Sequence, residues 1–424
     1  MVDVFSAISS RVPVERSLAR LRQLSQFVRR RALLRDLFFV FLTLVMLTDH
    51  DLPNRYLDGF YYGLLIVAFA TLRSSDTREL AQSWILRICF CFLLFMWLTP
   101  LWTGGVGYYD WWPLGFRSLR VFSFALISAV VVLLRKDSIE ELLCWLGWIA
   151  FGTALYSFSL FYPDRFLSER LQIFPWPNPN TGSAIFGLLA SGIATGPAVV
   201  PKNLRLGYIA IVWVLIVTVC FAGTRAALLG FMFSVIGYTL SSRNSFETRS
   251  WIRRSVITVA GVLTAVTAAL AFGAYDKIFR GSSLRDEVFL GFWKIALERF
   301  WLGHGIQNEF SYVVSGLPAP HNQLLTALLY GGIGAVLLYG GLYAAMLIVS
   351  IRHYRRGGSF AMAAMTIYLI VHGMFETVAI ASFGLSSAGW RWLYLWAPIG
   401  FAAGLELHMR RSRHGHDVDA AGTC

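Results

Sequence analysis

Long uninterrupted runs of apolar residues constrain this sequence more than any other feature. Many of the runs are about 17–25 residues long, the length with which an α-helix crosses roughly 30 Å of hydrocarbon. A backbone inside a bilayer must satisfy its own hydrogen bonds, which only helices and closed barrels achieve. The runs are continuous and do not alternate with polar residues, so they predict helices. We therefore expect an all-α polytopic membrane protein.

The composition supports this expectation. Of 424 residues, 56% are hydrophobic and only 14% are charged, whereas soluble domains are about 25% charged. No polar stretch is long enough to bury a core of its own, which excludes a large soluble domain. The apolar runs predict about twelve transmembrane helices, at residues 32–48, 58–72, 83–102, 118–135, 141–161, 181–200, 206–222, 226–241, 255–274, 323–351, 360–381 and 391–408.

The distribution of Lys and Arg predicts the orientation. If the N-terminus is inside, the inner segments carry about twice as many Lys and Arg as the outer ones, which is the bias that cytoplasmic loops show. An even number of helices then places both termini in the cytoplasm. The net charge of +13 follows from this bias and from attraction to anionic lipid, so no nucleic-acid partner is expected.

Three regions follow from this topology. Residues 1–31 read as a basic amphipathic helix on the inner leaflet, or else as a disordered basic arm. We expect residues 32–408, with the outer segment 276–322, to form the transmembrane domain, and residues 409–424 to form a cytoplasmic tail. Residues 1–31 have no apolar core that ends in a cleavage site, so we expect no cleaved signal peptide. The five cysteines have neither disulfide nor zinc spacing, so no metal is expected.

The outer segment 276–322 is longer than any other predicted loop. Long loops in compact proteins are usually functional or disordered, and this one is too aromatic for disorder. Residues 285–302 place apolar side chains at helical spacing and end at Gly303, so they predict an amphipathic surface helix. Residues 307–317 predict a second short helix.

A histidine and several arginines stand out on the outer side. His321 follows Pro320 and precedes Asn322, a good N-cap for the next helix, so it is held at the membrane boundary. Arg225 is the only charge in a very short outer turn. An arginine at this depth is costly unless it meets water or an anion, although it can also snorkel.

These residues predict an outward-facing anion site. Arginines grip phosphate or pyrophosphate with bidentate hydrogen bonds, which suits Arg225, Arg280 and Arg285. A neutral histidine accepts a proton from a hydroxyl nucleophile, which suits His321. The alternative for His321 is an ordinary loop histidine. Glu376 follows His372 by one helical turn on the same outer side and is a further candidate. The alternative for Glu376 is a structural ion pair with a neighbouring helix. Five tryptophans are predicted to anchor the membrane interface: Trp111, Trp112, Trp176, Trp390 and Trp392.

The order of short motifs over roughly residues 220–335 resembles the O-antigen ligase family, which is grouped with the O-antigen polymerases. The matching pieces are Gly223-Thr224-Arg225, Ser283-Leu284-Arg285, Gly303-His304-Gly305, His321-Asn322 and Tyr330-Gly331-Gly332-Ile333-Gly334. In one departure, Phe289 stands where the family pattern has a tryptophan, and Trp293 follows a turn later.

The resemblance implies an all-helical membrane glycosyltransferase of the bacterial inner membrane, with its active site facing the periplasm. Such ligases transfer polysaccharide from undecaprenyl pyrophosphate to the lipid A–core oligosaccharide, with inversion and without a metal or other cofactor. On this resemblance, Arg225 and Arg285, with Arg280, bind the pyrophosphate, and His321 is the general base.

Two alternatives remain from the sequence. An O-antigen polymerase or another lipid-linked glycan transferase would use the same donor chemistry. A glycan or lipid transporter is the alternative from another class. Transporters place helix breaks and ionisable residues near the bilayer midplane, whereas here the unusual residues gather at the outer edge.

Overall fold

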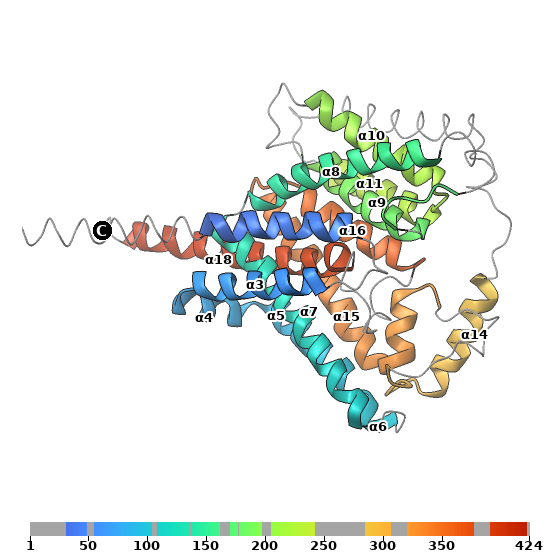
Figure 1. Ribbon diagram of the computed structural model, residues 1–424. Helices are drawn as coiled ribbons and strands as arrows, with labels where there is room; N and C mark the ends of the chain where they lie inside the picture. Colours follow the sequence, from blue (N-terminus) through green and yellow to red (C-terminus); the bar gives the residue numbers. More distant parts are fainter. Residues whose placement is uncertain are drawn as a thin grey trace, which may run out of the picture.

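A computed structural model of the chain describes residues 31–48, 55–103, 108–135, 137–161, 170–176, 178–196, 205–241, 285–306, 320–376 and 391–421. These residues are largely helical and hold no named strand (Figure 1). The helices are residues 31–47, α3 (Arg55–Thr71), α4 (Ser74–Gln82), α5 (Trp84–Leu98), α6 (Pro100–Thr103), α7 (Tyr108–Leu134), α8 (Ser138–Phe161), α9 (Pro179–Thr195), α10 (Arg205–Phe221), α11 (Arg225–Ser241), α14 (Arg285–Glu298), α15 (Gln323–Arg355), α16 (Ala361–Gly373), the π-helical turn η4 (Trp392–Trp396) and α18 (Ala397–Ala421).

Four helical stretches within the described residues are long and apolar enough to cross a membrane: Trp84–Thr103, Trp111–Leu134, Ser138–Phe161 and Gln323–Arg355. Shorter apolar helices accompany them, among them α10 and α11. The fold is therefore that of an all-α, multi-pass membrane protein. The predicted number of twelve spans and their orientation remain predictions.

Most predicted segments coincide with helices. The ninth, 255–274, lies outside the described residues, as do residues 1–30 and 307–317. Residues 73–82, the gap between the second and third predicted spans, contain α4, because the Asp76 carboxylate accepts the Arg73 amide at 3.0 Å and starts a helix. Helix α18 continues to Ala421, beyond the boundary predicted at 408.

Small residues let the helices pack closely. Helix α18 runs along α7, where a Cβ added at Gly400 or Gly404 would lie 2.2 Å from the Ala125 carbonyl oxygen or 2.6 Å from that of Ala129. Two small residues four apart permit such an approach between membrane helices. The prediction that Trp176 and Trp392 anchor the membrane interface is wrong. Both side chains are buried, because they fill the core between helices.

A break in α15 is filled by a loop. Gly332 has φ 64° and ψ −163° inside the helix, so the regular hydrogen bonds are interrupted there. The Ile333 amide donates to the Phe300 carbonyl at 2.8 Å, and the His304 amide donates to the Leu329 carbonyl at 2.8 Å. Residues 299–305 thus satisfy backbone groups that the break releases. Gly331 and Gly332 admit this loop at Gly303, and Gly331 and Gly334 lie against Phe95 of the neighbouring helix α5.

Charged side chains join several helices at one end of the bundle. The Asp76 carboxylate contacts Arg411 at 2.5 Å and Arg31 at 3.3 Å, which links α4 to α18 and to the helix at 31–47. Burial by itself would raise the pKa of Asp76. The hydrogen bonds from the Arg73 amide and Arg411 and the charges of both arginines outweigh burial, so the pKa lies below its usual value.

Candidate functional site

His321 is held between two fixed points. Its φ of 50° lies in the left-handed region, which residues other than glycine seldom adopt. The next residue, Asn322, caps α15 by accepting the Leu325 amide at 2.9 Å, and it donates to the Met374 carbonyl at 3.0 Å. The start of α15 is therefore tied to the end of α16. A strained residue that two helix ends hold in place is typical of a functional site.

Glu376 is the partner of His321. The distance from His321 Nδ1 to Glu376 Oε2 is 3.3 Å, and the Glu376 side chain is 7% exposed against 30% for His321. The Glu376 amide donates to the His372 carbonyl at 3.0 Å, which ends α16 in a tight turn. If the carboxylate is ionised it only accepts, so Nδ1 carries the proton and Nε2 of a neutral imidazole accepts. This is the arrangement that a general base needs.

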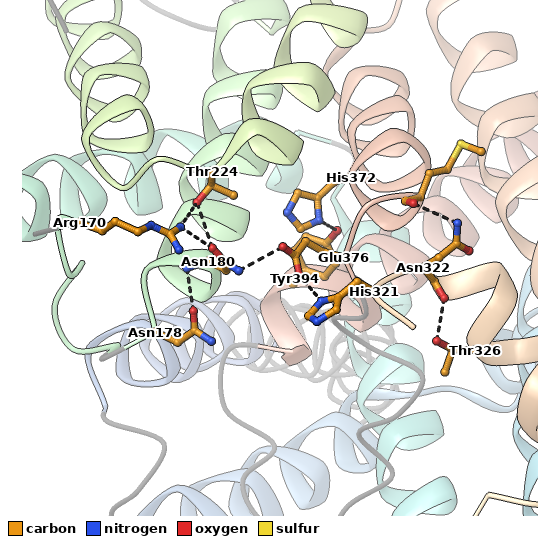
Figure 2. A network of polar contacts seen from close by, with 11 residues as sticks. Arg170, Asn178, Asn180, Thr224, His321, Asn322, Thr326, His372, Glu376 and Tyr394 are labelled. Carbon is orange, nitrogen blue, oxygen red and sulfur yellow. Dashed lines mark hydrogen bonds and ion pairs between the residues drawn. The ribbon is translucent and has the colours of Figure 1, made fainter. Parts of the chain in front are cut away.

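A chain of polar contacts continues from Glu376 to other helices (Figure 2). Asn180, in the first turn of α9, donates from Nδ2 to Glu376 Oε1 at 3.1 Å. Its Oδ1 accepts from Arg170 Nη2 at 2.6 Å. Arg170 Nη2 also lies 3.2 Å from Thr224 Oγ1. Segments that are far apart in the sequence therefore meet at one site.

Thr224 belongs to the turn that presents Arg225. Arg170 Nε donates to the Ala222 carbonyl at 2.6 Å, and Gly223 turns the chain with φ 66°. Arg225 follows as the first residue of α11, with an exposed side chain. The partial positive charge of a helix N-terminus and the guanidinium add in this place, so the turn favours an anion.

The structure brings together only some of the predicted site residues. It brings His321 into one polar network with the turn that carries Arg225. Arg285 is the first residue of α14. Arg280 lies outside the described residues. The predicted grouping of Arg280 and Arg285 with Arg225 thus stays a prediction.

Two other histidines have structural surroundings. His304 Nε2 lies 2.7 Å from the Ile295 carbonyl oxygen, which holds the loop against α14. His372 is buried, with its Nδ1 2.7 Å from the Tyr394 hydroxyl and its ring stacked on Tyr368. Within the described ranges, no three His, Cys, Asp or Glu side chains come together in a way that could hold a metal ion. Metal independence remains a prediction from the sequence.

No local pattern in the sequence indicated Arg170 or Asn180 as site residues, or the contact between Glu376 and His321. The segment Asn178-Pro179-Asn180 carries a signal that was available: the Asn178 side chain caps α9 by accepting the Asn180 amide at 2.9 Å. A cap predicts where a helix starts. It does not predict that Asn180 faces a carboxylate 196 residues later.

Fold and site together define a class: an all-α, multi-pass membrane protein in which one polar network joins a histidine–carboxylate pair to an arginine-bearing turn. No protein-family model matches the chain. The chain is similar to the O-antigen ligase of Pseudomonas aeruginosa, with 27% identity over 169 residues. The match covers 38% of this chain and spans 41% of the length of that relative. This distant similarity suggests the O-antigen ligase family and hints at a glycosyltransferase-type enzyme.

Proposed function

We propose that the chain is an O-antigen ligase. It transfers polysaccharide from undecaprenyl pyrophosphate to the lipid A–core oligosaccharide, at the periplasmic face of the bacterial inner membrane. The observation that carries the proposal is the contact between His321 and the buried Glu376, in the same network as the Arg225 turn. The similarity to an O-antigen ligase supports the choice of a lipid-linked glycan as substrate.

His321 acts as the general base in this proposal. An acceptor sugar hydroxyl lies against Nε2, which takes the proton as the hydroxyl oxygen forms a bond to the anomeric carbon of the donor. Glu376 contacts the opposite ring nitrogen and stabilises the positive charge that the imidazole gains. The attack comes from the face opposite to the leaving group, so the anomeric configuration inverts.

Arginines receive the leaving group. The bond between the anomeric carbon and the phosphate oxygen breaks, and both electrons leave with undecaprenyl pyrophosphate. Arg225 stabilises this charge together with the N-terminus of α11. Arg285 opens α14 in the same way, and we propose that it, with Arg280, binds the second phosphate.

The test uses cells that lack their own ligase. They receive the wild-type protein, His321→Ala, Arg225→Ala, or Arg352→Ala as a matched control. Arg352 is an exposed arginine near the far end of α15 from His321. Immunoblots establish equal protein levels, and the lipopolysaccharide is separated on a gel.

We expect the wild type and Arg352→Ala to restore a ladder of long chains on lipid A–core. His321→Ala and Arg225→Ala should leave bare core and accumulate lipid-linked polymer. Longer lipid-linked chains without any ladder would instead favour an O-antigen polymerase. A ladder from every variant would retain the ligase and refute the proposed site. Absence of a ladder with the wild type in its native host would refute the ligase proposal.

A further inference from the structure

The polar chain in Figure 2 extends beyond the residues that would touch substrate. Asn180 stands at its centre and contacts two groups with opposite ends of one amide. Oδ1 faces the guanidinium of Arg170 at 2.6 Å, and Nδ2 faces the carboxylate of Glu376 at 3.1 Å. Arg170 contacts the turn that carries Arg225, the proposed leaving-group site, and Glu376 contacts His321, the proposed base. Asn180 therefore lies between these two parts of the proposed active site.

The chemistry of Arg170 fixes which way the Asn180 amide points. A guanidinium only donates hydrogen bonds, so the amide oxygen must face Arg170 and the amide nitrogen must face Glu376. The nitrogen donates to Oε1 of Glu376, and Oε2 faces His321 Nδ1. The orientation of the carboxylate that contacts the candidate base is therefore set two residues away, at Arg170.

The same arginine holds the other half of the site. It donates to the Ala222 carbonyl at 2.6 Å and to the Thr224 hydroxyl at 3.2 Å, so it grips both sides of Gly223. The Leu171 amide adds a bond to the Phe221 carbonyl at 3.1 Å. The segment at 170–171 thus fixes the turn from which Arg225 begins α11.

We propose that Asn180 and Arg170 are positioning residues. They link the orientation of the base, His321, to the turn at residues 222–224 that presents Arg225, which we call the donor-binding turn. Neither needs to touch substrate, because Asn180 acts through Glu376 and Arg170 acts through the turn at 222–224. The inference rests on the proposed function. It adds that the base and the leaving-group site form a single unit, which one amide joins.

Asn180→Asp separates the two roles of the amide. The new carboxylate still accepts from Arg170, so the donor-binding turn keeps its support. Its second oxygen takes the place of Nδ2 and faces Glu376 Oε1, where two acceptors repel each other. We expect kcat to fall roughly 10-fold and the donor KM to change less than about twofold, as loss of an interaction made in the transition state requires.

Glu376→Gln provides the second arm. The glutamine amide can donate to the aspartate of Asn180→Asp while its oxygen faces His321 Nδ1, so the double variant regains a matched pair. Asn180→Asp should therefore cost nothing further in the Glu376→Gln background. Variants at independent sites would multiply their effects instead. Ser191→Ala is the matched control, because Ser191 is buried on the same helix and bonds only locally, to the Gly187 carbonyl at 2.8 Å.

The experiment measures kcat and donor KM for the purified full-length proteins in lipid nanodiscs, with a lipid-linked polysaccharide donor and lipid A–core acceptor. Thermal unfolding establishes that each variant is folded. Support requires a fall in kcat for Asn180→Asp, no further fall in the double variant and wild-type rates for Ser191→Ala. An active wild type with an equally active Asn180→Asp, or with multiplying effects, overturns the inference alone. A wild type without transfer overturns the proposed function, and the inference with it.

Discussion

Glu376→Gln removes one charge beside His321 and preserves the size of the side chain. In the proposed reaction the imidazole becomes positive as it takes the acceptor proton, at 3.3 Å from the carboxylate. Two unit charges at this separation interact by about 5 kcal/mol at an effective dielectric constant of about 20. His321 is 30% exposed, so water screens part of this interaction.

Glutamine also cannot satisfy both neighbours. Asn180 Nδ2 and His321 Nδ1 are both donors toward Glu376, and glutamine offers only one acceptor oxygen. Because its oxygen can still face His321, part of the interaction survives. We expect a loss of about 2 kcal/mol of transition-state stabilisation, which corresponds to a roughly 30-fold lower kcat.

The assay follows the initial rate of transfer by the purified protein at saturating donor and acceptor. Glu376→Asp serves as the conservative variant, because it keeps the charge and shortens the side chain, and it should recover part of the rate. An unchanged kcat in Glu376→Gln would refute the role of Glu376 in stabilising the charged imidazole. So would a change confined to KM, since that would mean Glu376 acts in binding and not in stabilising the charged imidazole.

Two further predictions concern stability and are measured by thermal unfolding. Gly303→Ala should lower the free energy of unfolding by about 3 kcal/mol, because φ is 69° and the new Cβ would lie 2.5 Å from backbone nitrogens of α15. The control Gly357→Ala, with φ 86° and open space around the new Cβ, should lower it by only about 1 kcal/mol; equal losses would contradict the close approach at Gly303. Asp76→Asn should lower the free energy of unfolding by about 2 kcal/mol at pH 7, because Arg411 and Arg31 lose their partner. Folding lowers the pKa of Asp76, so the carboxylate contributes to the free energy of unfolding above about pH 4, and this contribution is lost as the pH falls through the pKa of the folded state. If the difference in free energy of unfolding between Asp76→Asn and the wild type stayed constant down to pH 3, this pH dependence would be contradicted.

The sequence predicted the helices well because a membrane span must be both long and apolar. Residues 141–161 and 323–351 each carry a run of the required length, and both fall on long helices. Helix α4 escaped prediction because it is polar and depends on a cap and on ion pairs with distant residues. Its stability comes from tertiary contacts, which no local pattern encodes.

The candidate site was predictable only in part. His321 stood out because Pro320 and a helix cap fix it locally, and Arg225 stood out because a charge in a tight outer turn is costly. Asn180 had no such signal, because an asparagine in the first turn of a helix looks like ordinary capping. Its contact with Glu376 depends on how α9 packs against α16.

The proposed function requires that the protein joins a lipid-linked polysaccharide to lipid A–core. The most direct measurement incubates the purified protein with both substrates and identifies the products by mass spectrometry, with the anomeric configuration determined by NMR. We predict lipid A–core that carries the glycan through an inverted linkage, release of undecaprenyl pyrophosphate, and no product from His321→Ala. Donor that is only lengthened, or donor that is not consumed by the wild type, would contradict it.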